Sequence, residues 1–208
     1  MNPLAIDSQG GAGPSSTREN NRSMTYEAVM LGQVRPTTAE LRALDDLFER
    51  LYATYNRPLY NYIYRLVGNW EQAEDLTQEA FLKAYNALGR LPADANHRAW
   101  LYRIATNAAY DVLRRRRLIQ WLPFFESDRP TGFDDPAKQT ADAIAVQNAL
   151  QRLPSDQRTC LLLYVCDHFT TEEIAAIMGC SRGAVKTRLF RARERFRQVY
   201  ASGEEGLL

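Results

Sequence analysis

The chain has 208 residues, of which 45% are hydrophobic and 25% are charged, and its formal net charge at pH 7 is +1. These values are typical of a globular protein, and they exclude a fibrous or largely disordered chain. Because the whole chain is nearly neutral, any surface that binds nucleic acid has to come from an uneven placement of charge.

Several other classes of protein are disfavoured. The longest uncharged apolar run, 161–166, is far shorter than the roughly 20 residues of a membrane-spanning helix, so we expect a cytoplasmic protein. The sequence has no phosphate-binding glycine loop, nucleophile motif or metal-ligand spacing, so we expect no enzyme, no metal and no cofactor. The cysteines, Cys160, Cys166 and Cys180, are expected to be small core residues, and a redox or metal role is the less favoured alternative.

The order of elements predicts an all-α protein with two small helical domains joined by a flexible linker. Residues 1–42 are rich in small polar residues and predict a flexible N-terminal tail. Apolar residues then recur three and four positions apart over 43–117, which predicts a first domain, with interruptions at Pro58 and at Gly68. Its second and third helices are expected at 70–88 and 98–117.

The second half is predicted to hold a linker and a separate domain. Residues 118–138 mix prolines, acids and aromatic residues without periodicity, which is typical of a linker. Residues 139–200 predict four short helices at 140–153, 155–167, 170–178 and 181–200, and 201–208 are a C-terminal tail. Thr170 and Glu173 fit a capping box, and Ser181 fits an N-cap.

The helix at 70–88 has one apolar side and one acidic side. The apolar side carries Ala73, Leu76, Ala80, Phe81, Ala84 and Leu88. The opposite side carries Asp75, Gln78, Glu79 and Leu82. A leucine among carboxylates favours a protein-binding face over a merely solvated one, because a partner would remove that leucine from water.

The helix at 98–117 is basic and interleaved with aromatic rings. Six arginines oppose one aspartate, for a local charge of +5, and Trp100, Tyr102 and Tyr110 lie between them. Cations hold phosphates, aromatic faces stack on unpaired bases and amides read base edges, so the pattern suits single-stranded DNA. The alternative is a solvated helix end whose arginines suit the C-terminal dipole, with Trp100 in the core.

The segment 170–197 predicts a helix-turn-helix. Its second helix carries seven cations and one acid over 181–197, and Val185, Leu189, Ala192 and Phe196 form its inward stripe. This leaves Arg182, Lys186, Arg188 and Arg191 free to meet base edges and phosphates. A plain solvated basic helix is the alternative.

Taken together, these motifs resemble bacterial RNA polymerase sigma factors of the sigma-70 family, in the extracytoplasmic-function (ECF) subfamily. The resemblance covers about 43–200 and rests on AEDLTQEAFLKAY at 73–85, RAWLYRIATN at 98–107, and LP, EEIA and VKTRL at 153–154, 172–175 and 185–189. It implies regulated transcription initiation in response to stress or an extracytoplasmic signal. The implied partners are core RNA polymerase, promoter DNA and an anti-sigma factor.

The resemblance also implies a role for each surface. Polymerase binding would fall to Asp75, Gln78, Glu79 and Leu82. Recognition of the melted minus-ten element would fall to Asn96, Arg98, Trp100, Arg103, Asn107, Arg114 and Arg117. Reading of the minus-thirty-five duplex would fall to Ser181, Arg182, Lys186, Thr187, Arg188 and Arg191.

Two other functions fit parts of the sequence. A helix-turn-helix regulator acting on duplex DNA without polymerase would explain the C-terminal domain. It leaves the acidic face around Asp75, and Arg103 and Asn107 on one side of the basic helix at 98–117, without a role. A polymerase-binding regulator without promoter specificity would explain the acidic face alone.

Overall fold

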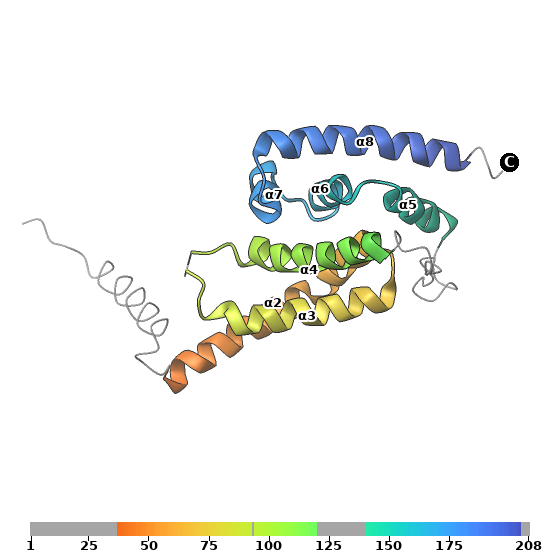
Figure 1. The fold of residues 1–208 in the computed structure, drawn as a ribbon. Helices are drawn as coiled ribbons and strands as arrows, with labels where there is room; N and C mark the ends of the chain where they lie inside the picture. The colour runs from red at the N-terminus through yellow and green to blue at the C-terminus, as the bar shows by residue number, and fades with distance from the viewer. Residues whose placement is uncertain (1–36, 93, 120–139, 205–208) are drawn as a thin grey trace, which may run out of the picture.

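The computed structural model describes residues 37–92, 94–119 and 140–204, and these form seven helices and no strand (Figure 1). The first group comprises α2 (Thr38–Val67), α3 (Trp70–Leu88) and α4 (His97–Ile119). The second comprises α5 (Ala141–Gln151), α6 (Ser155–Val165), α7 (Thr171–Met178) and α8 (Arg182–Glu204). The predicted all-α class is confirmed. Most of the predicted tail and nearly all of the predicted linker lie outside the described residues.

Helix α2 is longer and more continuous than predicted. It begins at Thr38 rather than 43, because Thr37 and Glu40 form a capping box that satisfies its first backbone N–H groups. It also runs through Pro58, where an interruption was expected. Pro58 is exposed, and so is Thr54, the residue whose carbonyl loses its partner. The neighbouring Leu59 is fully buried and holds the helix in the core.

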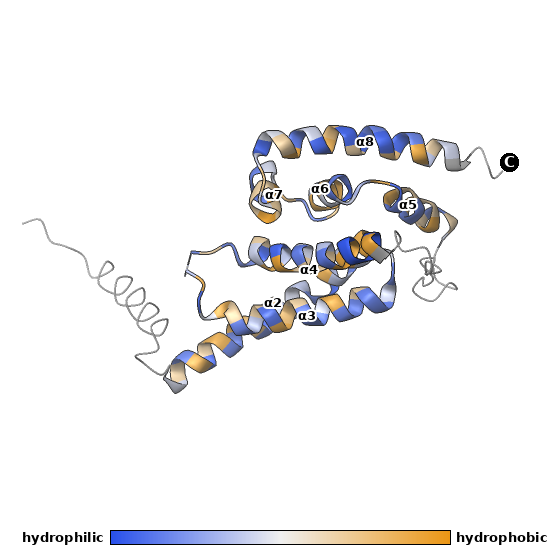
Figure 2. Cartoon of the chain, viewed as in Figure 1, coloured by the Kyte–Doolittle hydropathy of each residue, from blue (hydrophilic) through white to orange (hydrophobic). Residues whose placement is uncertain are grey.

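The first domain is built on the apolar side predicted for α3 and on an apolar stripe of α4. All six apolar residues predicted for α3 are buried, and so are Leu101, Ala105 and Ala108 of α4. Hydrophobic and hydrophilic segments alternate along both helices in Figure 2, as expected for helices that bury only one side. A buried hydrogen bond of 2.8 Å between the hydroxyls of Tyr62 and Thr106 ties α2 to α4.

The second domain places α7 and α8 as a helix-turn-helix against α6. Thr170 and Glu173 form the predicted capping box of α7, and Gly179 ends that helix in the left-handed conformation at φ 61°. Ser181 accepts a hydrogen bond of 3.2 Å from the backbone N–H of Ala184, as predicted for an N-cap. The inward stripe of α8 is confirmed, because Val185, Leu189 and Ala192 are buried.

The two domains pack against each other, which the sequence did not indicate. Helix α4 lies beside α6 and α7 (Figure 1). A continuous apolar cluster runs from α2, α3 and α4 into α6, α7 and α8. The loop between α6 and α7 turns at His168, whose φ of 54° is left-handed, and this turn brings Asp167 and Phe169 against α4.

Two further predictions are settled by the described residues. Cys160 is buried, as expected, but Cys166 is exposed and Cys180 is half-buried, so the cysteines are not all core residues. None of the described helices is both long and apolar enough to cross a membrane.

Candidate nucleic-acid interface and partner-binding face

The outer side of α3 presents the predicted partner-binding residues to solvent. Asp75, Gln78 and Glu79 are exposed, and Leu82 is 63% exposed in their midst. Glu79 pairs with Lys83 at 2.5 Å, one turn along the same helix, so this ion pair remains at the surface. An exposed leucine beside carboxylates combines an apolar anchor with a charged rim, which is the composition of a docking surface.

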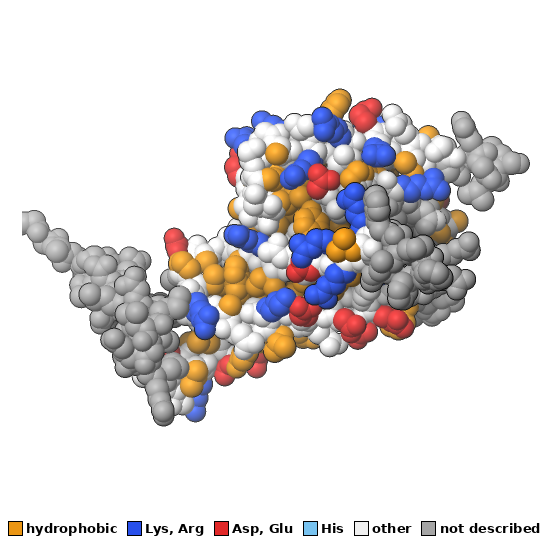
Figure 3. All heavy atoms as spheres, in the orientation of Figure 1, with side chains coloured by type: hydrophobic (Ala, Val, Ile, Leu, Met, Phe, Trp, Pro, Cys, Tyr) orange, Lys and Arg blue, Asp and Glu red, His pale blue; other side chains and the backbone are white. Residues whose placement is uncertain are grey.

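Four of the predicted minus-ten residues share one face of α4. Trp100, Arg103, Asn107 and Arg114 follow each other at intervals of three, four and seven residues, so they lie on one side of the helix. Trp100 is half-buried against the core, whereas the other three are exposed. Lys and Arg side chains gather in a band across the middle of Figure 3, and carboxylates gather below it.

Two predicted minus-ten residues point elsewhere, toward the second domain. Asn96 caps α4 by accepting a 3.0 Å hydrogen bond from the N–H of Ala99, and its amide donates to Glu173 at 3.0 Å. The guanidinium of Arg98 donates to the backbone carbonyl of Asp167 and lies 4.1 Å from the ring centre of Phe169. In this arrangement neither side chain lies with the Arg103 face.

The aromatic residues interleaved with the arginines also differ from prediction. Tyr102, a candidate for base stacking, is only 1% exposed and donates a 2.6 Å hydrogen bond to the carboxylate of Asp167. Tyr110, another of the interleaved aromatic residues, is half-buried beside Thr159 of α6, and burial raises its pKa to about 12. Both expectations were wrong, because the second domain covers this side of α4.

Two other arginines near the end of α4 behave differently from each other. Arg117 is exposed, as predicted for a phosphate contact. Arg116 instead donates a 2.9 Å hydrogen bond to the carbonyl of Val67, at the end of α2. The arginine run at 114–117 is therefore partly structural.

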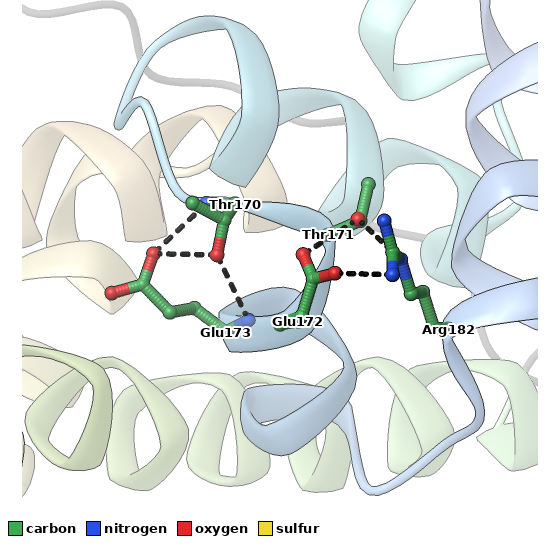
Figure 4. Close-up of polar contacts among 5 residues, drawn as sticks. All are labelled: Thr170, Thr171, Glu172, Glu173 and Arg182. Atoms are coloured by element: carbon green, nitrogen blue, oxygen red, sulfur yellow. Dashed lines mark hydrogen bonds and ion pairs between the residues drawn. The ribbon is translucent and has the colours of Figure 1, made fainter.

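The turn between α7 and α8 is held by a polar network that includes Arg182 (Figure 4). Its guanidinium pairs with Glu172 at 2.7 Å and donates to the hydroxyl of Thr171 at 3.3 Å. The hydrogen bond from Thr171 lowers the pKa of Glu172, which keeps that carboxylate charged. Arg182 thereby orients α7 relative to α8 while its side chain stays accessible.

The other predicted duplex-binding residues fall into two groups. Lys186, Thr187 and Arg191 are exposed on the outer side of α8. Arg188 is half-buried and pairs with Asp156 of α6 at 3.0 Å, which fixes α8 to the domain. Ser181 is used as the N-cap.

Phe190 was missed by the sequence analysis. It is 68% exposed, and it follows Lys186 by one helical turn on the outer side of α8. The sequence could have revealed it, because Phe190 is an aromatic residue that lies outside the inward stripe of Val185, Leu189 and Ala192. Within the described ranges, no group of three or more His, Cys, Asp or Glu side chains could hold a metal ion.

Comparison with known proteins identifies the two halves of the chain. Residues 51–119 match the family model for sigma-70 region 2, and residues 143–196 match the model for sigma-70 region 4. The RNA polymerase sigma-H factor of Pseudomonas aeruginosa is 38% identical over 159 residues, which cover 71% of this chain and 82% of that relative. The ECF RNA polymerase sigma factor SigW of Bacillus subtilis is 31% identical over 166 residues, covering 74% and 88%. The chain belongs to the ECF branch of the sigma-70 family.

A solved structure supports the same assignment for this sigma factor. The sigma factor RpoE from Bartonella quintana, co-crystallised with the anti-sigma factor NepR, matches with a TM-score of 0.64 and 27% identity. The match covers 73% of this chain and 95% of that one.

Family membership fixes the general function of this sigma factor. It directs RNA polymerase to promoters, and it is a non-catalytic subunit rather than an enzyme. The alternative of a helix-turn-helix regulator acting without polymerase is therefore excluded.

Proposed function

We propose that this sigma factor docks on core RNA polymerase through the outer face of α3 formed by Asp75, Gln78, Glu79 and Leu82. The observation that carries this assignment is the 63% exposure of Leu82 between acidic neighbours, while the other side of α3 is fully used in the core. A polymerase surface with cations around an apolar recess would complement such a face.

The exposed face of α4 is proposed to hold the opened minus-ten strand. Arg103 and Arg114 supply phosphate contacts, Asn107 supplies an amide that can read a base edge, and Trp100 lies beside them with part of its ring accessible. Arg117 extends the cationic track toward the end of the helix. Asn96 and Arg98 would join this surface once the second domain moves away.

The outer face of α8 is proposed to enter the major groove of the minus-thirty-five duplex. Lys186 and Arg191 are free to contact guanines or phosphates, and Arg182 lies at the start of the helix. Phe190 adds an apolar contact suited to the methyl group of thymine. Arg188 and Ser181 act mainly by positioning the helix.

The two DNA contacts work as one because polymerase holds both domains in place. Joining two weak sites raises the effective concentration of the second, which can increase affinity by roughly 10² to 10⁴. We further propose that the protein acts in the cytoplasm, where it would meet polymerase, and that an anti-sigma factor restrains it until a stress or extracytoplasmic signal arrives. The co-crystal of the RpoE relative with NepR supports this last point.

Co-purification with core polymerase tests the α3 assignment. The double variant Asp75→Arg, Glu79→Arg should lose binding to core polymerase while keeping its helical circular dichroism, because both side chains are exposed. Asp46→Arg, a reversal at an exposed acid of α2, is the matched control and should bind normally. Undiminished binding by the double variant would remove this face from the proposed function.

A further inference from the structure

We infer that Thr171 and Glu172 of α7 hold the guanidinium of Arg182 ready for one guanine of the minus-thirty-five element, an inference that rests on the role proposed above for Arg182. A guanine offers two acceptors in the major groove, O6 and N7, which suit a guanidinium. Thr171 and Glu172 act through the arginine and touch no base. They are positioning residues that set the base specificity of α8.

The three side chains form a closed ring of polar contacts (Figure 4). The Thr171 hydroxyl accepts a hydrogen bond of 3.3 Å from Nε of Arg182 and donates one of 2.9 Å to Oε2 of Glu172. The other carboxylate oxygen, Oε1, lies 2.7 Å from Nη1 of Arg182. Because each group holds the next, the guanidinium is fixed more closely than a single ion pair would fix it.

The ring is anchored at both ends to the start of a helix. Thr170 caps α7, so Thr171 and Glu172 lie in its first turn, where the helix dipole favours a carboxylate. The hydrogen bond from Thr171 lowers the pKa of Glu172, so the group that pairs with the arginine stays charged. Ser181 caps α8 by accepting a hydrogen bond of 3.2 Å from its first turn, and Arg182 is the first residue of that helix. The backbone below all three side chains is therefore fixed.

The ring contributes to binding through preorganisation more than to stability. The side chains of Arg182 and Glu172 are 59% and 55% exposed, and ion pairs in water stabilise a fold only slightly. An arginine that is free at the surface samples many rotamers, and ordering it on a base costs free energy. Arg182 is already held through Nε and Nη1, while the remaining N–H groups on Nη1 and Nη2 can still donate to a guanine. It therefore loses less conformational freedom when it binds.

Gly183 indicates that a partner comes close to this end of α8. Glycine weakens a helix, and the fold does not require it here, because the nearest contact of an added Cβ would be Oγ of Ser181 at 3.9 Å. Gly183 is exposed and lies one turn before Lys186 and Thr187, on the outer side of α8. The missing side chain lets the helix backbone approach DNA closely, which brings the adjacent Arg182 within reach of a base.

Two variants open the ring and leave Arg182 in place. Glu172→Gln keeps the size of the side chain and removes the charge that holds the guanidinium. Thr171→Val keeps the branched shape and removes the hydroxyl, whereas Thr171→Ser retains the hydroxyl and should behave as the parent. Glu194→Gln is the matched control, because Glu194 also pairs with an arginine, Arg197, at 2.6 Å, farther along α8.

The test is selection of a promoter library with a randomised minus-thirty-five element by holoenzyme assembled from core polymerase and the full chain, followed by sequencing of the bound DNA. The parent should prefer guanine at one position, and Arg182→Ala should abolish that preference. Glu172→Gln should reduce it about fivefold, because the cost of ordering the arginine falls only on the complex with guanine, and Thr171→Val should act in the same direction. Binding of Glu172→Gln to a duplex of random sequence should not fall, since a negative charge near the phosphates is removed. Glu194→Gln should keep the guanine preference of the parent.

A double variant separates positioning from direct contact. In the Arg182→Ala background, Glu172→Gln should have no further effect on base preference, because it acts through the arginine. A further change in that background would mean that Glu172 itself touches a base, which would overturn the positioning role. A guanine preference that survives Glu172→Gln undiminished would overturn it as well, while the minus-thirty-five role of Arg182 would stand. A parent without any preference that depends on Arg182 would refute both roles together.

Discussion

Substitution of Leu82 isolates the apolar part of the proposed polymerase contact. Because the residue is 63% exposed, Leu82→Ala should change the free energy of unfolding by no more than about 0.5 kcal/mol. Complete burial of a leucine is worth roughly 1.5–3 kcal/mol, and about two-thirds of this side chain is available to a partner. Allowing for what alanine retains, we expect a loss of about 1 kcal/mol, or roughly fivefold in Kd for core polymerase.

Leu76, on the opposite side of the same helix, supplies the contrast. It is buried, so Leu76→Ala should lower the stability by about 2–5 kcal/mol. Thermal unfolding and a polymerase-binding titration on both variants separate a docking residue from a core residue. A Leu82→Ala protein that binds polymerase as tightly as the parent, or that unfolds as easily as Leu76→Ala, would refute the reasoning.

Three further outcomes are expected. Thr170→Ala removes the capping box of α7 and should cost about 1 kcal/mol in thermal unfolding, whereas Thr170→Ser, which keeps the capping hydroxyl, should cost much less; equal losses would argue against the cap. Replacing thymine by uracil in a duplex that carries the minus-thirty-five element removes methyl groups, and it should weaken binding of the parent protein by about 0.8 kcal/mol per contacted methyl. Binding of Phe190→Ala should not change. Equal losses for both proteins would exclude Phe190 as the methyl contact. Burial between the two domains raises the pKa of Asp167, against the hydrogen bond from Tyr102 and the positive charges of Arg98 and Arg65. Protonation of Asp167 therefore favours the contact between the two domains, fully below the ordinary carboxyl pKa of about 4 and progressively less as the pH rises through the raised pKa. Small-angle X-ray scattering should show a more compact chain on acidification, with a flatter response in Asp167→Asn, and expansion on acidification would contradict the assignment.

Local patterns predicted the elements of the fold well. The spacing of apolar residues predicted α3 at its observed bounds and the inward stripe of α8, because each helix buries one side. The capping residues Thr170 and Ser181 could be predicted from the sequence because a cap depends only on residues within three positions. The interruption predicted at Pro58 was wrong. A proline destabilises a helix interior, but the burial of the neighbouring Leu59 offsets this cost, and the local sequence does not show that burial.

The contact between the domains could not be predicted in this way. Arg98 and Tyr102 were counted with the DNA-binding residues from composition, whereas their partners Asp167 and Phe169 lie more than sixty positions away in the sequence. No periodic pattern links residues at that separation. The exposed faces around Leu82 and Lys186 were predictable because they are what remains once the inward stripes are assigned.

In the proposed function, one chain couples polymerase to two DNA elements held at a set spacing. The most direct measurement is transcription in vitro by purified core polymerase and this protein on a promoter library in which both elements and the distance between them are randomised. We predict initiation from a subset that shares two short elements at one preferred spacing, and loss of that subset with Asp75→Arg, Glu79→Arg. Initiation without any shared element, or equally at all spacings, would contradict the account.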